Sequence, residues 1–219
     1  MGAKHLLSSL AITVLLLLSP AAHPQSYPAN QQPMYGGIRK SESMRYTDRA
    51  FIKRILAMGV TRKQGARKMA ELGFRYFSKS NFAAAMKRFN QAWLLDPNLG
   101  AAYHGYALVL IERDRNIKGA DRMFRRAIAA LSTWGGAFAD YGRFLLLEKR
   151  LPEAISVLGR GLARYPNQRD LRGRFALALF VAHKYKRGCA EARRALPNTQ
   201  RSERRTLLLV LKSPKCVGH

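Results

Sequence analysis

The residues that could carry acid–base or nucleophilic chemistry are few and poorly placed for it. His104 and His183 have no serine, cysteine or paired acid at a spacing typical of a catalytic site. Gly159 and Gly161 lie inside a helical pattern, not between a strand and a helix, so they indicate close packing and no nucleotide site. A pair of catalytic carboxylates would have to come from acids that fit loop and surface positions: Glu112, Asp114, Asp121, Asp140 and Glu148. We therefore expect no enzymatic activity, no catalytic residue and no cofactor.

Positive charge is the dominant chemical feature of the chain. The 219 residues include 39 Lys and Arg against 13 Asp and Glu, a net charge of +26, which favours anionic partners. Residues 169–219 alone carry a net +10. Ten arginines fall on the outer sides of several expected helices, and their planar side chains suit phosphate or carboxylate. We call them the arginine ridge: Arg122, Arg125, Arg126, Arg160, Arg164, Arg193, Arg194, Arg201, Arg204 and Arg205. The alternative is a solvated surface, or a basic bias shared by all exported proteins of the organism.

The N-terminal residues have the pattern of an export signal. A basic start precedes an apolar run over residues 6–18, and Ala21 and Ala22 follow a Ser-Pro break. The run is shorter than the roughly 20 apolar residues that a membrane-spanning helix needs. We expect residues 1–22 to be a cleaved signal peptide, with the cleavage point somewhere between 21 and 26. An uncleaved anchor or a buried first helix is the alternative.

Export would narrow the choice of partner and compartment. Chromosomal DNA and ribosomes are absent outside the cytoplasm, and no nucleic-acid-binding motif is visible, so nucleic acid is not expected. An anionic glycan, a lipid headgroup or an acidic protein remain as partners of the arginine ridge. No later segment is long and apolar enough to span a bilayer. We expect a soluble mature chain in a periplasm, with an extracellular space or a secretory lumen as alternatives.

Two cysteines, Cys189 and Cys216, could form a disulfide in an exported chain. Cys189 would lie early in one helix and Cys216 just after the last one, so a bridge would fasten the C-terminal helix. Sequence alone does not show whether the two are close enough, and the pairing stays open. Two cysteines with distant histidines form no ligand cluster, so we expect no metal site.

Ahead of any repeat, the sequence predicts a disordered leader and one helix. Residues 23–46 are rich in Pro, Gln, Asn, Gly and Ser. A helix is expected over residues 47–59, with Thr47 as its N-cap and Asp48 favoured by the helix dipole. Its apolar residues share one face and need a partner surface.

A repeat of about 34 residues is the strongest pattern in the chain. Small residues that open a second helix recur at intervals of 35, 34 and 34 residues: Ala85, Ala120, Ala154 and Gly188. The first unit has small, aromatic and helix-ending residues at fixed offsets: Leu72, Gly73, Tyr76, Ala85, Phe89, Ala92 and Pro97. This pattern resembles the tetratricopeptide repeat (TPR) family, with Met69 where the family has Trp. The array covers residues 61–198, in units at about 65–98, 100–133, 135–168 and 169–198.

The resemblance implies an all-α fold, a right-handed solenoid of about four helical hairpins. The helix at 47–59 would cap its start, and residues 199–219 would supply a capping helix and tail at its end. In TPR proteins the first helices line a concave groove that holds a peptide or a partner's helix.

Helical phase assigns an apolar and aromatic strip with some arginine to this groove: Arg67, Phe74, Phe77, His104, Leu108, Ile111, Arg143, Arg174 and Phe180. The alternative is that the phenylalanines only pack between repeats. A family clamp for a terminal carboxylate is absent, because Ala70, Gly105 and Ala139 occupy its polar positions.

Three functions remain open from the sequence. The first is a scaffold for protein–protein interaction in the cell envelope, binding a protein or peptide ligand through the concave groove. The second is an adaptor that docks to an anionic polymer or membrane surface through the arginine ridge. The third is a structural component that assembles with copies of itself.

Overall fold

The computed structural model describes residues 27–130 and 132–217, and all its regular elements there are helical. The expected signal peptide, residues 1–22, lies outside the described residues. Within the described ranges, no helix is both long and apolar enough to cross a membrane. In chain order the elements are η1 (Ala29–Gln31), η2 (Pro33–Gly37), α1 (Glu42–Ala57), α2 (Arg62–Ser78), α3 (Phe82–Leu95), α4 (Gly100–Glu112), α5 (Ile117–Ala129), α6 (Gly135–Leu147), α7 (Leu151–Arg164), α8 (Leu171–Val181), α9 (Tyr185–Ala195), η3 (Leu196–Asn198) and α10 (Arg201–Lys212).

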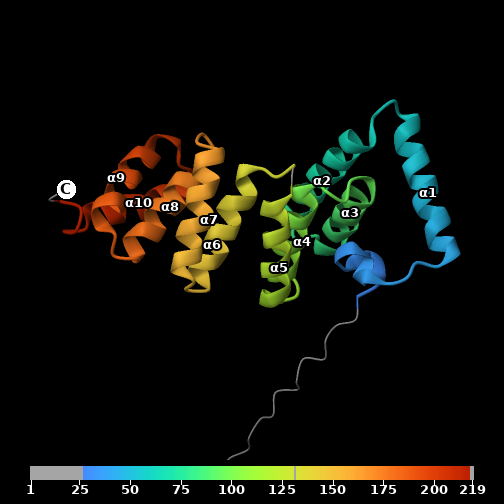
Figure 1. Cartoon of the computed structure of the whole chain (residues 1–219), viewed down its shortest axis with the longest axis horizontal. Coiled ribbons are helices and arrows are strands. Elements are labelled where there is room, and N and C mark those ends of the chain that lie inside the picture. Colours follow the sequence, from blue (N-terminus) through green and yellow to red (C-terminus); the bar gives the residue numbers. More distant parts are fainter. Residues whose placement is uncertain (1–26, 131, 218–219) are drawn as a thin grey trace, which may run out of the picture.

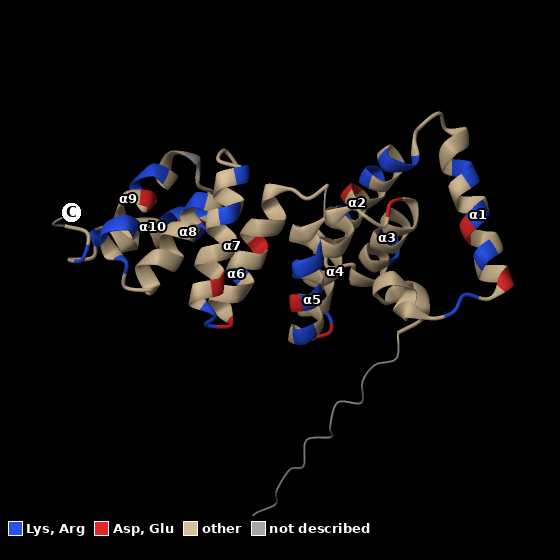
Figure 2. Cartoon of the chain, viewed as in Figure 1, with Lys and Arg blue, Asp and Glu red and all other residues tan. Residues whose placement is uncertain are grey.

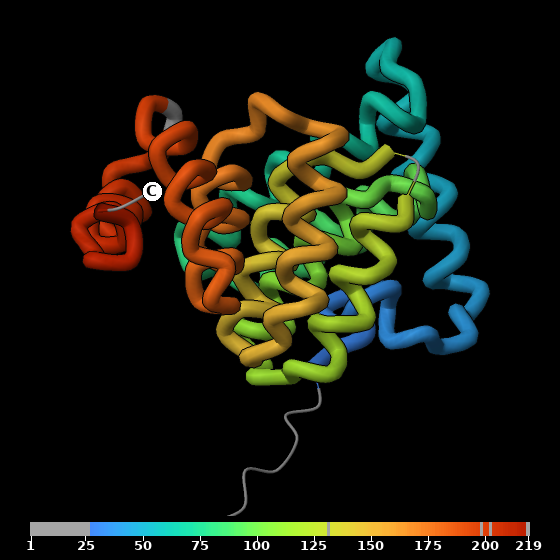
Figure 3. The backbone as a smooth tube through the Cα atoms, turned by 60° about the vertical axis from the view of Figure 1, so that its left-hand side comes forward, coloured from blue at the N-terminus to red at the C-terminus, as the bar shows by residue number. Residues whose placement is uncertain are grey.

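Helices α2 to α9 form four hairpins: α2 with α3, α4 with α5, α6 with α7, and α8 with α9. Figure 1 shows the hairpins following one another along the long axis, from α1 at one end to α10 at the other. The turned view in Figure 3 keeps this order, with the C-terminal helices and α1 on opposite sides. Each expected unit contains one of these hairpins.

A left-handed residue turns each hairpin at the same place in the repeat: Ser80, Arg115, Lys149 and His183. In the first hairpin the amide of Asn81 donates to the carbonyl of Tyr76 at 3.0 Å, which closes the end of α2. The Asn81 side chain then accepts from the amide of Ala84 and caps α3. The third and fourth hairpins repeat this closure, and in the second the amide of Asn116 reaches one residue further back, to Leu110. The turn is therefore set by backbone geometry more than by residue type.

Small residues let the helices approach closely around one phenylalanine. A Cβ atom added at Gly73 would lie 2.5 Å from the Phe89 ring, and one added at Gly105 would lie 2.3 Å from it. Phe89 is fully buried, so its ring occupies the space that both glycines leave. Gly73 provides this contact within the first hairpin, and Gly105 provides it from the next one.

The core runs through the whole stack in three parts. The main part joins the second and third hairpins with α3 of the first and α8 of the fourth, through residues such as Phe89, Tyr106, Phe124, Leu158 and Phe175. A second part fixes α1 on the first hairpin through Phe51 and Ile55. The third part lies between α8, α9 and α10, so α10 covers the apolar end of the last hairpin.

A disulfide joins Cys189 of α9 to Cys216, just after α10. Both cysteines are buried in the third part of the core, with Leu207 and Val210 of α10. The bridge closes a segment that contains the whole of α10, so it holds this helix against the last hairpin.

The N-terminal helix begins earlier than the sequence analysis expected. α1 starts at Glu42, and Ser41 is its N-cap, accepting a hydrogen bond from the amide of Met44. Thr47 lies inside the helix, where its hydroxyl donates to the carbonyl of Ser43. Serine and threonine are both good caps, and the one nearer the N-terminus begins the helix here.

The expected disordered leader is also corrected in part. From Tyr27 onward it forms the turns η1 and η2, and both pack against α3. Its composition favours disorder, but polar groups of α3 and α4 bind its backbone. Residues 23–26 lie outside the described part of the chain.

One junction between hairpins is looser than the others. Helix α3 packs closely on α4, and α7 on α8, but α5 and α6 share fewer contacts. Figure 1 shows α5 and α6 further apart than α7 and α8. We call this place the central junction.

Candidate functional site

The inner face of the stack is made by the first helix of each hairpin. Helices α2, α4, α6 and α8 contact one another in that order, and α10 follows α8. Helix α10 therefore occupies the place of a first helix in a fifth hairpin. Side chains that lie about one repeat apart can meet across these neighbouring helices.

Four polar side chains, one from each of four helices, form a continuous series of hydrogen bonds along this face. His104 Nε2 of α4 lies 2.9 Å from Asp140 Oδ2 of α6. Arg174 of α8 donates from Nη1 to Asp140 Oδ1 at 2.7 Å and from Nε to Glu203 Oε1 of α10 at 2.8 Å. We call these residues the inner polar chain. It ties the second hairpin to the C-terminal helix.

The two carboxyl groups of the inner polar chain have opposite pKa shifts. Burial acts to raise the pKa of Asp140, but the hydrogen bond with His104 and the charge of Arg174 outweigh burial and lower the pKa to about 2. Burial raises the pKa of Glu203, and Arg174 offsets only part of that effect. Asp140 is therefore the firmly ionised member, and Glu203 is the one that protonates more readily.

His104 is buried, with only 1% of its surface exposed. Its Nε2 atom contacts Asp140, and its Nδ1 atom has no hydrogen-bond partner among the described residues. The expectation that His104 lines an open groove is therefore wrong. The ring lies under neighbouring aromatic side chains and takes part in holding the second and third hairpins together.

A hollow of about 400 Å³ opens beside the inner polar chain, between α6, α8 and α10. We call it the inner pocket. The exposed Arg143 has no ion pair within the described ranges; its charge acts on Glu203 from beyond contact distance, and its guanidinium is free to bind a ligand carboxylate or phosphate directly. The lining combines apolar, polar and charged side chains: Arg143, Leu146, Asp170, Gly173, Arg174, Leu177, Gln200, Glu203, Thr206 and Leu207.

An aromatic cluster occupies the inner side of the central junction. The Trp134 ring, just before α6, lies 5.9 Å from Phe74 and 5.5 Å from His104 between centroids. Phe74 also meets Phe89 edge-on at 5.1 Å. Trp134 stays 41% exposed, so the cluster presents an aromatic edge to the inner face.

The predicted groove residues divide into three groups. Arg143 and Arg174 meet in the inner pocket, and Phe74 joins the aromatic cluster. Arg67 is exposed at the other end of the inner face.

The remaining predicted groove residues are partly buried, and the two phenylalanines among them make ring contacts within their own hairpins. Phe77 contacts Phe82 within the first hairpin, and Phe180 contacts Tyr185 within the last one. Leu108 and Ile111 are partly buried against the main core.

Sequence reasoning missed the acidic members of the site. Asp140 and Glu203 pair with His104 and Arg174, although Asp140 had been considered only as a surface residue. A signal was present: positions 104, 140 and 174 are separated by 36 and 34 residues, close to one repeat, and 203 follows 29 residues later. Polar residues that recur at the repeat period on first helices would have pointed to them.

All arginines of the ridge are exposed, but only some of their side chains contact other groups of the chain. Figure 2 shows Lys and Arg on most helices and few acidic residues beside them. Six ridge members contact other groups of the chain: Arg125, Arg126, Arg164, Arg193, Arg194 and Arg204. The other four have no ion pair within residues 27–130 and 132–217: Arg122, Arg160, Arg201 and Arg205.

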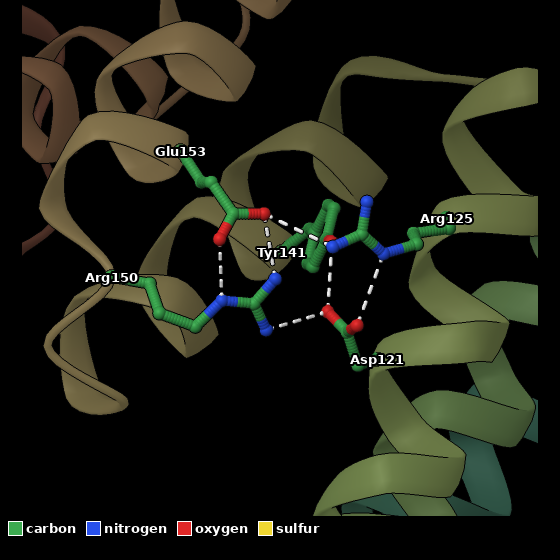
Figure 4. A network of polar contacts seen from close by, with 5 residues as sticks. All are labelled: Asp121, Arg125, Tyr141, Arg150 and Glu153. Atoms are coloured by element: carbon green, nitrogen blue, oxygen red, sulfur yellow. Dashed lines mark hydrogen bonds and ion pairs between the residues drawn. The ribbon is translucent and has the colours of Figure 1, made fainter.

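A second polar cluster bridges the central junction on the outer side (Figure 4). Asp121 of α5 accepts hydrogen bonds from Tyr141 at 2.8 Å, from Arg150 at 2.9 Å and from Arg125 at 3.0 Å. Glu153 of α7 accepts from both arginines. We call these five residues the junction cluster. Burial and the bond to Asp121 raise the pKa of Tyr141 to about 12, so the phenol stays a donor.

Comparisons with known proteins agree on the fold. No family model matches the chain, and no curated protein matches it either. A solved structure of PilF from Pseudomonas aeruginosa superposes with a TM-score of 0.58 at 24% identity, over 68% of this chain and 69% of that one.

A second solved structure, the TPR protein YrrB, superposes with a TM-score of 0.52 at 19% identity, over 77% of this chain and 88% of that one. YrrB is described as having an unusual peptide-binding site. At these identities the likeness shows the fold alone. The chain is an all-α stack of helical hairpins of the TPR type, as its sequence predicted.

Proposed function

We propose that this protein is an exported scaffold that binds a peptide or helix of a partner protein in the inner pocket. The observation that carries the proposal is the unpaired Arg143 beside half-buried leucines, in a hollow between three first-position helices. Such a lining suits a short segment that combines a carboxylate with apolar side chains. The peptide-binding site named for YrrB supports this use of the fold, and the N-terminal signal pattern supports export.

A capture experiment tests the pocket. The mature chain is immobilised and exposed to an envelope extract of its own organism, beside the variants Arg143→Glu and Arg160→Glu. Arg160 is also exposed and unpaired within the described residues, but it lies on the outer side. We expect wild type and Arg160→Glu to retain the same protein and Arg143→Glu to lose it. Equal retention by all three would contradict the proposal.

Export is tested separately on the full-length chain. After expression and cell fractionation, the N-terminus of the mature protein is read by mass spectrometry. We expect a start between residues 22 and 27 and recovery outside the cytoplasm. An intact Met1 in the cytoplasmic fraction would rule out a cleaved signal.

A second candidate function uses the arginine ridge. It is favoured by the four ridge arginines whose side chains have no ion pair, hydrogen bond or ring contact in the described part of the chain: Arg122, Arg160, Arg201 and Arg205. Binding to vesicles with anionic lipid should then weaken steeply with added salt and should fall in an Arg160→Glu and Arg205→Glu double variant. If vesicle binding were unchanged in that variant, the general attraction of a chain of net charge +26 to anionic lipid would explain the binding without the ridge.

A further inference from the structure

The leader segment from Tyr27 to Gly37 folds back onto the outer side of the array. Its turns η1 and η2 contact α3, and Pro33 and Met34 lie beside residues of α5. Figure 1 shows this segment in blue beneath α3. The floor between α3 and α5 is made by α4, through Tyr106 and Leu110, which are both buried. We call this place the outer cleft.

Asn90 of α3 forms hydrogen bonds with the backbone of the leader. It is fully buried, and its Nδ2 donates to the carbonyls of Asn30 at 3.0 Å and Gln32 at 2.8 Å. Its Oδ1 accepts from the amide of Tyr35 at 3.3 Å and from the Tyr106 hydroxyl at 2.7 Å. The leader thus supplies three of the four hydrogen bonds that satisfy this buried amide, which would be unfavourable to bury without partners.

Side chains around Asn90 add further contacts of the kind that recognise a peptide. Arg113 donates to the carbonyl of Gln31 at 3.0 Å and stacks 3.7 Å from the centre of the Tyr27 ring. At the other end Arg126 donates to the sulfur of Met34 at 3.1 Å. Backbone carbonyls give affinity, and the ring and thioether give selectivity.

The leader is held in a conformation that it would not adopt alone. Met34 and Tyr35 are left-handed, with φ of 53° and 59°, followed by Gly36 and Gly37 with φ of 70° and 68°. Left-handed backbone at residues other than glycine is unfavourable by about 1–2 kcal/mol each. A hollow of about 380 Å³ lies beside Met34, so the cleft is not completely filled. The contacts with the array therefore outweigh the cost of the strained backbone. That cost weakens the binding of the leader, and this favours its exchange for another peptide.

We propose that the outer cleft is a second peptide-binding site, which recognises a segment chiefly through its backbone carbonyls, and that residues 27–37 are its ligand in cis. The site lies on the opposite side of the array from the inner pocket and does not depend on it. While the leader is bound, the outer cleft is closed to a segment of the same kind from another molecule.

The test releases the leader without changing the cleft. In the full chain, Gly36→Val and Gly37→Val together disfavour the left-handed turn, because β-branched residues rarely adopt positive φ. A fluorescent peptide with the sequence of residues 27–37 is then titrated by anisotropy up to about 1 mM, the order of concentration at which a tethered ligand acts. We expect this variant to bind the peptide at least ~10-fold more tightly than wild type, since its own leader no longer competes.

Added substitutions identify the site of binding. In the released background, Asn90→Ala should abolish peptide binding, and Arg143→Glu in the inner pocket should leave it unchanged. If Asn90→Ala lowers the melting temperature strongly, Arg113→Ala, which removes the bond to Gln31, replaces it. A released variant that stays folded by circular dichroism yet binds no better than wild type would overturn the proposal. So would binding that survives loss of Asn90 or Arg113.

Discussion

At Asp140, two neighbours hold one carboxylate in its ionised form. Its folded pKa of about 2 lies below the roughly 3.9 of an unfolded aspartate. Its contribution to stability is therefore present above pH 4 and is lost as the pH falls towards 2. We predict that Asp140→Asn lowers the free energy of unfolding by about 2 kcal/mol at pH 7 and by clearly less near pH 3. Urea denaturation at the two pH values measures both quantities.

Glu203 provides the matched control on the same arginine. Its pKa is raised, so ionisation of Glu203 opposes folding at neutral pH and this cost disappears as the pH falls. We expect Glu203→Gln to change the free energy of unfolding at pH 7 less than Asp140→Asn does. If both variants lost the same free energy of unfolding, the inner polar chain would act as one unit, and the two pKa shifts would not determine the contribution of each carboxyl group.

Two glycines inside helices should respond to alanine in opposite ways. At Gly105 the new Cβ would lie 2.3 Å from the buried Phe89 ring, and we predict a loss of about 3 kcal/mol. At Gly159 the nearest atom, on Phe175, would be 3.6 Å away, an ordinary contact. Alanine there should stabilise by about 0.5–1 kcal/mol, because glycine is a poor helix former. Melting temperatures of the two variants check the signs; a stabilising Gly105→Ala would contradict the packing described for Phe89.

At the level of single residues, helical phase could place some side chains on the inner face but could not show which of them are buried. Arg143 and Arg174 follow from phase, because the inner side of a first helix is defined by its hairpin partner. The burial of His104 does not follow, because it depends on Trp134 and Phe74, which reach it from other units. Contacts between side chains of different repeats could not be predicted from a sequence examined one repeat at a time.

Among the elements, α10 depends most on a single covalent bond. The Cys189–Cys216 disulfide spans 27 residues, and closing such a loop is expected to contribute about 3.5 kcal/mol. We predict that reduction lowers the denaturant midpoint and speeds amide exchange in residues 201–217, while α2 to α5 exchange as before. A Cys189→Ala and Cys216→Ala double variant should resemble the reduced chain and ignore the reductant. Equal loss of protection throughout the chain would show that α10 does not open separately.

The element that sequence reasoning read least well is the leader. Its Pro, Gly and Gln residues have no helical period, and locally they favour disorder. Order comes from Asn90, Arg113 and Arg126, which lie roughly 60 to 90 residues later in the chain. The left-handed turn residues of the hairpins were missed for a different reason. Ser80, Arg115, Lys149 and His183 share a backbone conformation but no residue type.

For the whole molecule, the repeat period was enough to predict a stack of four hairpins with a helix at each end. Fixed spacing of small and aromatic residues determines how each hairpin packs, and like hairpins then stack in one direction. The central junction was not predictable in this way. Its character comes from acids and arginines of different units, such as Asp121 and Arg150, that meet where α5 and α6 share few contacts.

Stability along a stack of repeats is the sum of the units and of the junctions between them, so the weakest junction decides whether the halves unfold together. At the central junction, where α5 and α6 share fewer contacts, Asp121 receives three hydrogen bonds and its side chain is only 20% exposed. We predict that Asp121→Asn uncouples the halves: amide exchange in α2 to α5 and in α6 to α9 should then report different free energies of opening. In wild type the two should agree within about 1 kcal/mol.

Arg125→Ala is the control for this prediction, because its side chain is 55% exposed and an exposed ion pair contributes about 0.5 kcal/mol or less. It should leave the halves coupled. If Asp121→Asn also leaves them coupled, the aromatic contacts of Trp134 on the inner side must hold the junction instead. Trp134→Ala would then separate the halves. Either result shows which contacts fix the point about which the inner face can bend. It thereby shows whether the inner pocket and the aromatic cluster can move relative to each other when a partner binds.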